Sequence, residues 1–339
     1  MERWIRVVSV GGGGGQSAVL GSLREFHVWL DAFVPVTDSG GSTHKLHHDY
    51  GTLSALGDLT KCMVAMMENR ELADLLMHRF EDQLSPHSVK NLLGTAAYIR
   101  SSHSLPEFLD RMHDALSLPT HRRVWPVSED STKLVATLGK DEFVINGESV
   151  IDNLHKNPLW DPVSHRINSV RMVPQVGILP EVRDRILGAD YLVVSPGDIF
   201  TSIVPVLLAK GFSESVAESS CKIIMVMNAM TKPGETNGLS SQDHVRVVER
   251  YLGREIDIAL CNSQDISQDQ KQAYQDEHKQ PVRLEWGADI SAQIITTPLL
   301  DPQEKEVRHS PELLGKALAE IMGLGKLAEE GVKISRMCN

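Results

Sequence analysis

A run of five glycines, Gly11 to Gly15, carries the clearest chemical signal in this 339-residue chain. Residues 5–10, IRVVSV, precede it and are typical of a strand buried on both faces, while residues 16–23 have the apolar spacing of a helix. Glycines at the start of a helix let a phosphate group approach free backbone N–H groups and the positive end of the helix dipole. A tight turn would need only one or two glycines, so we favour a phosphate- or nucleotide-binding turn.

The glycine run matches neither of the two standard phosphate-binding patterns. Counting G-x-G-x-x-G from Gly11 places Gln16 at the third glycine, and no G-x-x-x-x-G-K-[ST] is present. The first mismatch, with the lack of an obvious histidine for hydride transfer, argues against an NAD-type oxidoreductase. The second mismatch excludes a P-loop NTPase.

Three more loops rich in Gly, Ser, Thr and acidic residues follow predicted strands, at 38–42, 195–202 and 228–236. Loops at the carboxyl ends of parallel strands meet in one crevice, which predicts a ligand site there. Asp38 would bind a ribose hydroxyl, a metal-bound phosphate or a substrate hydroxyl in that crevice, or would only close an Asx-turn. Asp58, near the start of a predicted helix, is either an N-cap or a second carboxylate at the same place.

Strand and helix patterns alternate along most of the chain and predict an α/β fold, a Rossmann-like, doubly wound, mainly parallel sheet with helices on both faces. We expect a single domain over 1–323 and a loosely held tail over 324–339. Alternation of period two predicts a small antiparallel insertion at about 121–150, either a lid or an edge of the main sheet. Residues 151–180 are expected to be connecting structure. The other predicted strands cover 5–10, 31–37, 190–194, 222–227, 256–260 and 282–285, and the predicted helices cover 16–23, 56–67, 71–80, 87–99, 106–118, 199–209 and 311–322.

Composition narrows the class of protein. A net charge of -11 without a basic stripe argues against nucleic acid as a partner. The N-terminus leads straight into a strand, and no apolar run approaches the ~20 residues of a membrane span, so we expect a cytoplasmic protein. The four cysteines lack C-x-x-C spacing and read as reduced thiols. His44, His47 and His48 form either a metal site or, as we favour, a solvated polar face, and we therefore assign no metal ligands.

Six segments together resemble the motifs of one family. Residues 11–17 (GGGGGQS) resemble a GGGTGLS turn, 37–42 (TDSGGS) an (A/T)DDGGSSG loop, and 57–63 (GDLTKCM) a GDIRNCL segment. Residues 87–93 (HSVKNLL) resemble HSVGNLL, 195–203 (SPGDIFTSI) resemble GPGSLYTSI, and 230–236 (MTKPGET) resemble MTQPGET. In this order they are similar to the gluconeogenesis-factor family, which binds UDP-sugars, affects bacterial cell shape and carbon metabolism, and is related to the 2-phospho-L-lactate transferase of deazaflavin-cofactor synthesis.

The resemblance implies a Rossmann-like domain with the nucleotide lying across the glycine turn and the loop that begins at residue 195. Arg308, in a VRHSP segment that resembles VRHDP, would contact the nucleotide sugar, and a permanent cation suits a diphosphate. Asp38 and Asp58 are the implied catalytic candidates and line the cleft where the transferase relatives place their acceptor. The other implied ligand-binding residues are Gly12, Gly13, Gly14, Gly15, Ser17, Ser39, Gly40, His87, Asn91, Ser195, Gly197, Asn228 and Thr231.

Four departures from the motifs bear directly on the ligand or a metal. Gly14 replaces a threonine and Leu239 replaces an aromatic residue, which removes a hydroxyl and a stacking ring. Ser39 replaces an aspartate, which weakens a Mg²⁺ site because Mg²⁺ is held by carboxylates and phosphates. Lys61 replaces an asparagine and would supply part of the charge that a metal supplies. Mg²⁺ stays a candidate cofactor.

Two functions remain open. We expect a regulatory protein that binds a nucleotide sugar. The alternative is a metal-dependent transferase that moves a phospho-acyl or nucleotidyl group, with Asp38 and Asp58 positioning the metal or the acceptor. The lack of a clear nucleophile–base pair and the presence of Ser39 favour the first. The sequence leaves open which base and sugar bind and the oligomeric state, a homo-oligomer included.

Overall fold

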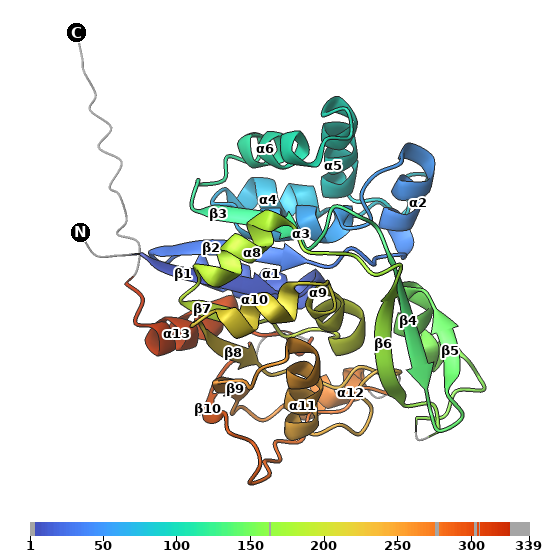
Figure 1. Ribbon diagram of the computed structural model, residues 1–339, viewed down its shortest axis with the longest axis vertical. Coiled ribbons are helices and arrows are strands. Elements are labelled where there is room, and N and C mark those ends of the chain that lie inside the picture. Colours follow the sequence, from blue (N-terminus) through green and yellow to red (C-terminus); the bar gives the residue numbers. More distant parts are fainter. Residues whose placement is uncertain (1–3, 163, 275–277, 302–303, 305, 326–339) are drawn as a thin grey trace.

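Seven parallel strands form the central sheet of the computed structural model, which describes residues 4–162, 164–274, 278–301, 304 and 306–325. The strand order is β10-β9-β8-β7-β1-β2-β3 (Figure 1). The strands are β1 (Ile5–Val10), β2 (Val28–Val34), β3 (Arg122–Pro126), β7 (Tyr191–Val194), β8 (Lys222–Val226), β9 (Ile258–Asn262) and β10 (Gln293–Thr297). The central strands are continuous apolar runs, as strands covered on both faces require. The predicted doubly wound α/β fold is confirmed.

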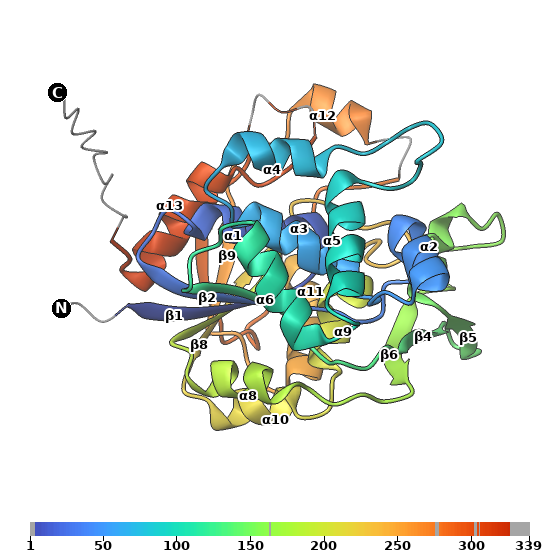
Figure 2. The same cartoon turned by 90° about the horizontal axis from the view of Figure 1, so that it is seen from above.

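Helices cover both faces of this sheet (Figures 1 and 2). One face carries α1 (Gly13–Leu23), α3 (Leu56–Ala65), α4 (Arg70–Met77) and α13 (Pro311–Met322), with α2 (Gly41–Tyr50), α5 (Val89–Arg100) and α6 (Leu105–Ala115) packed beyond α3. The other face carries α8 (Pro180–Leu187), the π-helical turn η2 (Ile199–Ile203), α9 (Val204–Leu207), α10 (Phe212–Glu218) and α11 (Ser241–Leu252). The short helix α12 (Gln268–Ala273) follows β9.

The chain builds the sheet outward from β1 in two directions. The first three strands run to one edge, and the chain then returns with β7 on the opposite side of β1 and continues to β10. β1 and β7 therefore flank the topological switch point, where the loops after the two strands diverge and leave a crevice. Val10 lies beside Val194 in the register, so the glycine run and the loop that starts at Ser195 leave the sheet side by side.

A second, three-stranded antiparallel sheet lies beyond the carboxyl ends of the parallel strands (Figure 1). Its order is β5-β4-β6, with β4 (Lys133–Leu138), β5 (Phe143–Asn146) and β6 (Ile167–Val173). The short helices α7 (Glu148–Asp152) and η1 (Leu154–Lys156) connect β5 to β6. The predicted insertion bounds of 121–150 are wrong at both ends, because β3 joins the large sheet parallel to β2 and β6 comes from the segment expected to be connecting structure.

Other bounds also differ from the prediction. β2 begins and ends three residues before the expected 31–37. The prediction of a strand at 282–285 is wrong. This segment follows Pro281 and pairs only locally with the loop after β8, where the Val282 N–H donates to the Ala229 carbonyl. The last strand is β10 instead. Most of the expected C-terminal tail, residues 326–339, lies outside the described residues. Within the described part, no helix is long and apolar enough to cross a membrane.

Candidate functional site

The glycine run forms the first turn of helix α1 instead of a loop ahead of it. The helix begins at Gly13, and its N-cap, Gly12, provides no side-chain cap. The Gly13 N–H donates to Asp58 Oδ1 at 2.9 Å. The N–H groups of Gly14 and Gly15 also belong to the first turn and have no intrahelical partner. Because they face a cleft at the positive end of a helix dipole, they are suited to bind an anion.

Two glycines in this turn are required by close approach of other groups. A Cβ atom on Gly15 would lie 1.6 Å from the carbonyl oxygen of Pro196, so this turn and the loop after β7 pack backbone against backbone. A Cβ atom on Gly12 would lie 2.8 Å from Asp58 Oδ2. Gly14 is different, because the nearest atom to its Cβ position is the Lys61 ammonium at 3.7 Å. A side chain at position 14 therefore has room.

Two buried polar side chains hold the turn from below. The Gln16 amide donates to the carbonyls of Ser9 and Phe33, at 3.0 and 3.1 Å, and so joins β1 to β2 where the strands end. Ser195 is fully buried, and its Oγ lies 2.9 Å from Ser9 Oγ. Ser195, which the motif implied as a ligand contact, thus lies beneath the cleft and supports the loop.

The loop after β7 is held by Asn228, which follows β8. The Gly197 N–H donates to Asn228 Oδ1 at 2.8 Å, and Asn228 Nδ2 donates to the Gly197 carbonyl at 2.7 Å. Thr231 is buried, and its Oγ1 accepts from the Gln280 N–H at 3.1 Å. The side chains of Asn228 and Thr231 form part of the cleft wall, and Gly197 contributes backbone atoms to the same wall.

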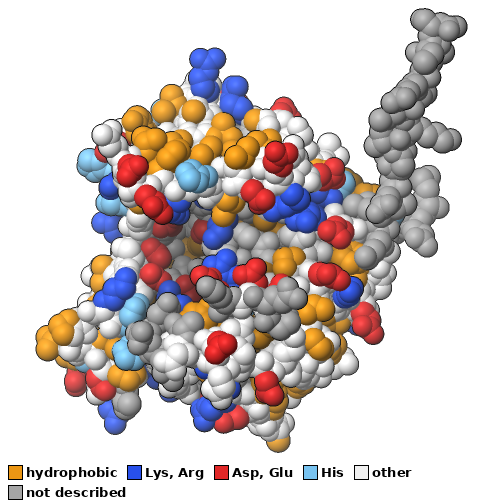
Figure 3. Space-filling model, turned by 180° about the vertical axis from the view of Figure 1, so that it is seen from behind, with side chains coloured by type: hydrophobic (Ala, Val, Ile, Leu, Met, Phe, Trp, Pro, Cys, Tyr) orange, Lys and Arg blue, Asp and Glu red, His pale blue; other side chains and the backbone are white. Residues whose placement is uncertain are grey.

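An open cleft of about 790 Å³ runs along these loops, visible as the hollow across the middle of the surface in Figure 3. This volume is typical of small-molecule sites. The cleft brings together the predicted residues Gly12, Gly13, Gly14, Gly15, Ser17, Gly197, Asn228, Thr231 and Arg308. Its basic lining residues are Arg24, Lys61, Arg70, Lys232, Lys279 and Arg308, and its acidic ones are Asp198, Asp301, Glu304 and Glu306. Basic side chains exceed acidic ones here although the whole chain has a net charge of -11.

The remaining predicted residues form a separate acidic end of the site, around the start of α2. There the Asp38 Oδ1 accepts from the Gly40 N–H at 2.9 Å, and the Ser39 N–H donates to Glu148 Oε2 at 3.3 Å. Burial raises the pKa of Asp38 to about 6, with a further contribution from the charge of Asp58. Burial and the charge of Asp38 raise the pKa of Glu148 to about 8. Asp58 connects this acidic end to the glycine turn.

The predicted residues His87 and Asn91 lie at the same acidic end. Asn91 Nδ2 donates to Ser42 Oγ at 2.9 Å, and Ser42 Oγ lies 2.9 Å from His87 Nδ1. Asn91 is buried and His87 is partly exposed. Sequence reasoning missed Glu148, which lies at the start of helix α7, after β5, and supplies a carboxylate beside Ser39, where the motif has an aspartate.

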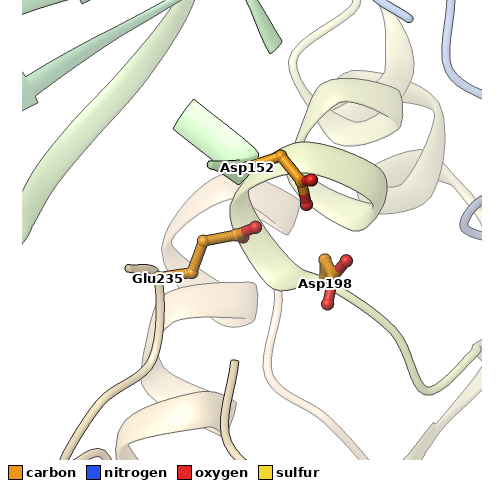
Figure 4. Close-up of side chains that lie close together, drawn as sticks. All are labelled: Asp152, Asp198 and Glu235. Atoms are coloured by element: carbon orange, nitrogen blue, oxygen red, sulfur yellow. The ribbon is translucent and has the colours of Figure 1, made fainter. Parts of the chain in front are cut away.

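A cluster of carboxylates lies where the small sheet meets the loops after β7 and β8. Asp152, Asp198 and Glu235 have oxygen atoms within 4.8 Å of one another (Figure 4). The Lys232 Nζ lies 2.6 Å from Asp152 Oδ1 and 3.1 Å from Asp198 Oδ2, so a lysine already supplies the cation. Glu235 instead accepts from the N–H groups of Phe200 (2.9 Å) and Thr201 (3.2 Å) and holds the start of η2. This cluster joins three segments and does not require a metal.

The class of protein follows from comparison with known families and structures. The family model for 2-phospho-L-lactate transferase CofD matches residues 7–300. A crystal structure of a Bacillus halodurans protein of the UPF0052 family aligns with a TM-score of 0.83 at 28% identity, over 92% of this chain and 99% of that chain. The fold with its switch-point cleft therefore defines a CofD-like α/β protein.

The family within that class follows from its relatives. The gluconeogenesis factor of Bacillus subtilis is 30% identical over 324 residues, which cover 94% of this chain and 98% of the relative. A Deinococcus radiodurans relative is 34% identical over 95% of this chain and 67% of its own length. The gluconeogenesis factor of Halalkalibacterium halodurans is 30% identical over 93% of this chain and 95% of its own. The chain belongs to the gluconeogenesis-factor family.

Proposed function

We propose that this protein binds a nucleotide sugar, with UDP-sugars the first candidates, and that it regulates carbon metabolism and cell shape through that binding. The observation that carries the proposal is the cleft at the switch point between β1 and β7. It combines uncapped N–H groups at the start of α1, a wall formed by the loop at Gly197 and an excess of basic side chains. Together these groups suit a diphosphate flanked by two larger groups.

The two cations of the cleft that we expect to contact the phosphates are Lys61 and Arg308. Among the described residues, the Lys61 ammonium forms no salt bridge and lies close to the open face of Gly14. Arg308 is 74% exposed and pairs with Glu306 at the opposite wall. A diphosphate seated on Gly14 and Gly15 would have a cation on each side, and the exposed arginine would exchange its carboxylate partner for a phosphate.

A thermal-shift screen tests the proposal. The full chain is heated with UDP-N-acetylglucosamine, UDP-glucose, GDP, GTP or NAD, with and without Mg²⁺. A ligand at about 100 times its Kd stabilises the fold by about 2.7 kcal/mol, which is measurable. We expect a shift with UDP-sugars that does not require Mg²⁺. Absence of a shift with all of these ligands would refute the proposal.

A second function, a metal-dependent transferase, is favoured by the carboxylates at the acidic end. Asp38, Asp58 and Glu148 offer oxygen ligands of the kind Mg²⁺ prefers. Burial raises the pKa of all three carboxyl groups, and neighbouring carboxylates raise the pKa of Asp38 and Glu148 further, so a bound cation would favour their charged forms. These three residues would hold the metal, which would neutralise phosphate charge during transfer. Product formation from a guanine or uridine nucleotide that requires Mg²⁺, and that Asp58→Asn abolishes, would support this function over pure binding.

A further inference from the structure

A buried ammonium group lies behind the acidic end of the site. The side chain of Lys90, in helix α5, is only 5% exposed. Its Nζ donates to the Gly57 carbonyl at 3.0 Å, to Thr60 Oγ1 at 3.3 Å and to Asn91 Oδ1 at 2.6 Å. An ammonium has three donors, and all three are satisfied here. A buried charge is stable only under this condition, so Lys90 is a built feature of the site.

Position 60 in α3 carries a small residue in this chain and position 90 in α5 carries a cation. The motifs that this chain resembles have the reverse arrangement. The GDIRNCL motif has arginine where this chain has Thr60, and HSVGNLL has glycine where it has Lys90. Helices α3 and α5 are tightly packed here, because a Cβ atom on Gly94 would lie 2.7 Å from Thr60 Cγ2. In this chain the cation comes from α5 instead of α3.

The lysine also fixes the direction of a chain of hydrogen bonds. Lys90 can only donate, so the oxygen of the Asn91 amide must face it, and Nδ2 must face Ser42. The Ser42 hydroxyl accepts that bond and has one hydrogen to give. Among the described residues its only other hydrogen-bond partner is His87 Nδ1, 2.9 Å away, and we assign the hydrogen to that bond. His87 Nδ1 is thereby an acceptor. The imidazole hydrogen resides on Nε2, which remains available to a bound molecule.

We propose that Lys90 is a positioning residue that replaces the arginine of the family motif and sets His87 as an Nε2–H donor at the acidic end of the site. The group it would contact is an acceptor oxygen, such as a phosphate or carboxylate oxygen, of a molecule that extends past Asp58. This role goes beyond nucleotide binding in the cleft, because neither Lys90 nor His87 is among the residues that line the cleft.

The imidazole ¹⁵N shifts of His87 test the proposal directly. The full chain is labelled at histidine and assigned with His87→Gln. It is studied near neutral pH, because burial lowers the pKa of His87 and also lowers the pKa of Lys90 to about 8, so the ammonium would be lost in alkaline buffer. We expect the Nε2–H tautomer in the native protein. Lys90→Met leaves the Asn91 amide free to turn over, so the tautomer ratio should shift by about tenfold, which is the equilibrium equivalent of one buried hydrogen bond. Lys45→Met is the matched control, because it removes a lysine near His87 that does not contact Asn91.

A double variant that exchanges the residue types at positions 60 and 90 distinguishes a loss of positioning from simple unfolding. The double variant Thr60→Arg with Lys90→Gly restores the motif arrangement, and we expect it to regain the native tautomer and a higher unfolding temperature than Lys90→Gly alone. An unchanged tautomer in Lys90→Met, or a double variant no better than Lys90→Gly, would overturn the proposal. Failure of the native protein to bind any nucleotide would refute the proposed function and leave this measurement unaffected.

Discussion

Replacing Gly15 by alanine tests the contact on which the cleft depends. The new Cβ atom would lie 1.6 Å from the Pro196 carbonyl oxygen and 2.5 Å from its carbonyl carbon. Real contacts of this kind are longer than 3 Å. The loop after β7 and the start of α1 must therefore separate by more than 1 Å, and both are held elsewhere, the loop by the two hydrogen bonds between Gly197 and Asn228.

Forced separation in a packed region costs about 1–3 kcal/mol. At about 2 °C per kcal/mol, which is the lower end for a chain of this size, Gly15→Ala should lower Tm by about 2–6 °C. The same displacement widens the gap between the α1 N–H groups and Gly197, so nucleotide affinity should fall more than stability. Binding geometry is sensitive to shifts of about 1 Å.

Gly14→Ala is the matched control, one residue away in the same helical turn. Its Cβ atom would have no neighbour closer than 3.7 Å, and alanine is a better helix former than glycine by up to about 1 kcal/mol. This variant should be as stable as the native protein or more so. Differential scanning fluorimetry and urea unfolding measure both variants. Equal Tm values for Gly15→Ala and Gly14→Ala would refute the reasoning, because the two sites differ only in that contact.

Three further predictions concern charge, buried polarity and the cleft. The pKa of Glu148 is raised from 4.5 to about 8, so the folded protein binds more protons than the unfolded chain in that interval, and its stability should fall as pH rises through it. Glu148→Gln should flatten this fall in a series of Tm measurements from pH 5 to 8, and an unchanged slope would contradict the assignment. Gln16→Leu removes two buried hydrogen bonds, although the Phe33 carbonyl still accepts from the Gly11 N–H, and it should cost about 1–3 kcal/mol in urea unfolding, whereas the exposed control Gln175→Leu should cost little. Arg308→Ala should leave Tm unchanged, because the side chain is 74% exposed, but should weaken UDP-sugar binding by about tenfold in calorimetry. The control is Arg246→Ala, which removes an exposed ion-paired arginine outside the cleft; an equal loss in both variants would show that Arg308 acts only through net charge.

The sequence predicted the fold well because buried parallel strands are recognisable without knowledge of their partners. The run Ile5–Val10 is rich in Val and Ile and buried on both faces from Val7 onward, and the segments of β7 and β8 share this composition. The partners of half-buried strands were not predictable in the same way. Alternation of period two is shared by β3, β4 and β6, yet β3 pairs with β2 in the large sheet, and β6 pairs with β4 across an intervening segment.

The site was predictable where residues act through the backbone and much less where they act through tertiary contacts. The glycines of α1 lie where the motif placed them. Glu148 meets Ser39 across 109 positions of the chain, and no local pattern indicates such a contact. Ser195 has the residue type of a ligand contact, but its place at the end of a central strand puts its hydroxyl in the core. Lys90 could be noticed only as a departure from a motif.

The switch point has a consequence for how the two halves of the chain depend on each other. The glycine turn belongs to the half that contains β1 to β3, and the loop at Gly197 belongs to the half that contains β7 to β10. Each half supplies one wall of the cleft, and neither forms it alone. A molecule that touches both walls therefore acts as a non-covalent cross-link between two parts of the polypeptide, and its binding energy is added to their association. After cleavage of the backbone near Leu159, which is 82% exposed between the halves, the pairing of β1 with β7 would still join the two pieces, and a bound ligand would strengthen their association.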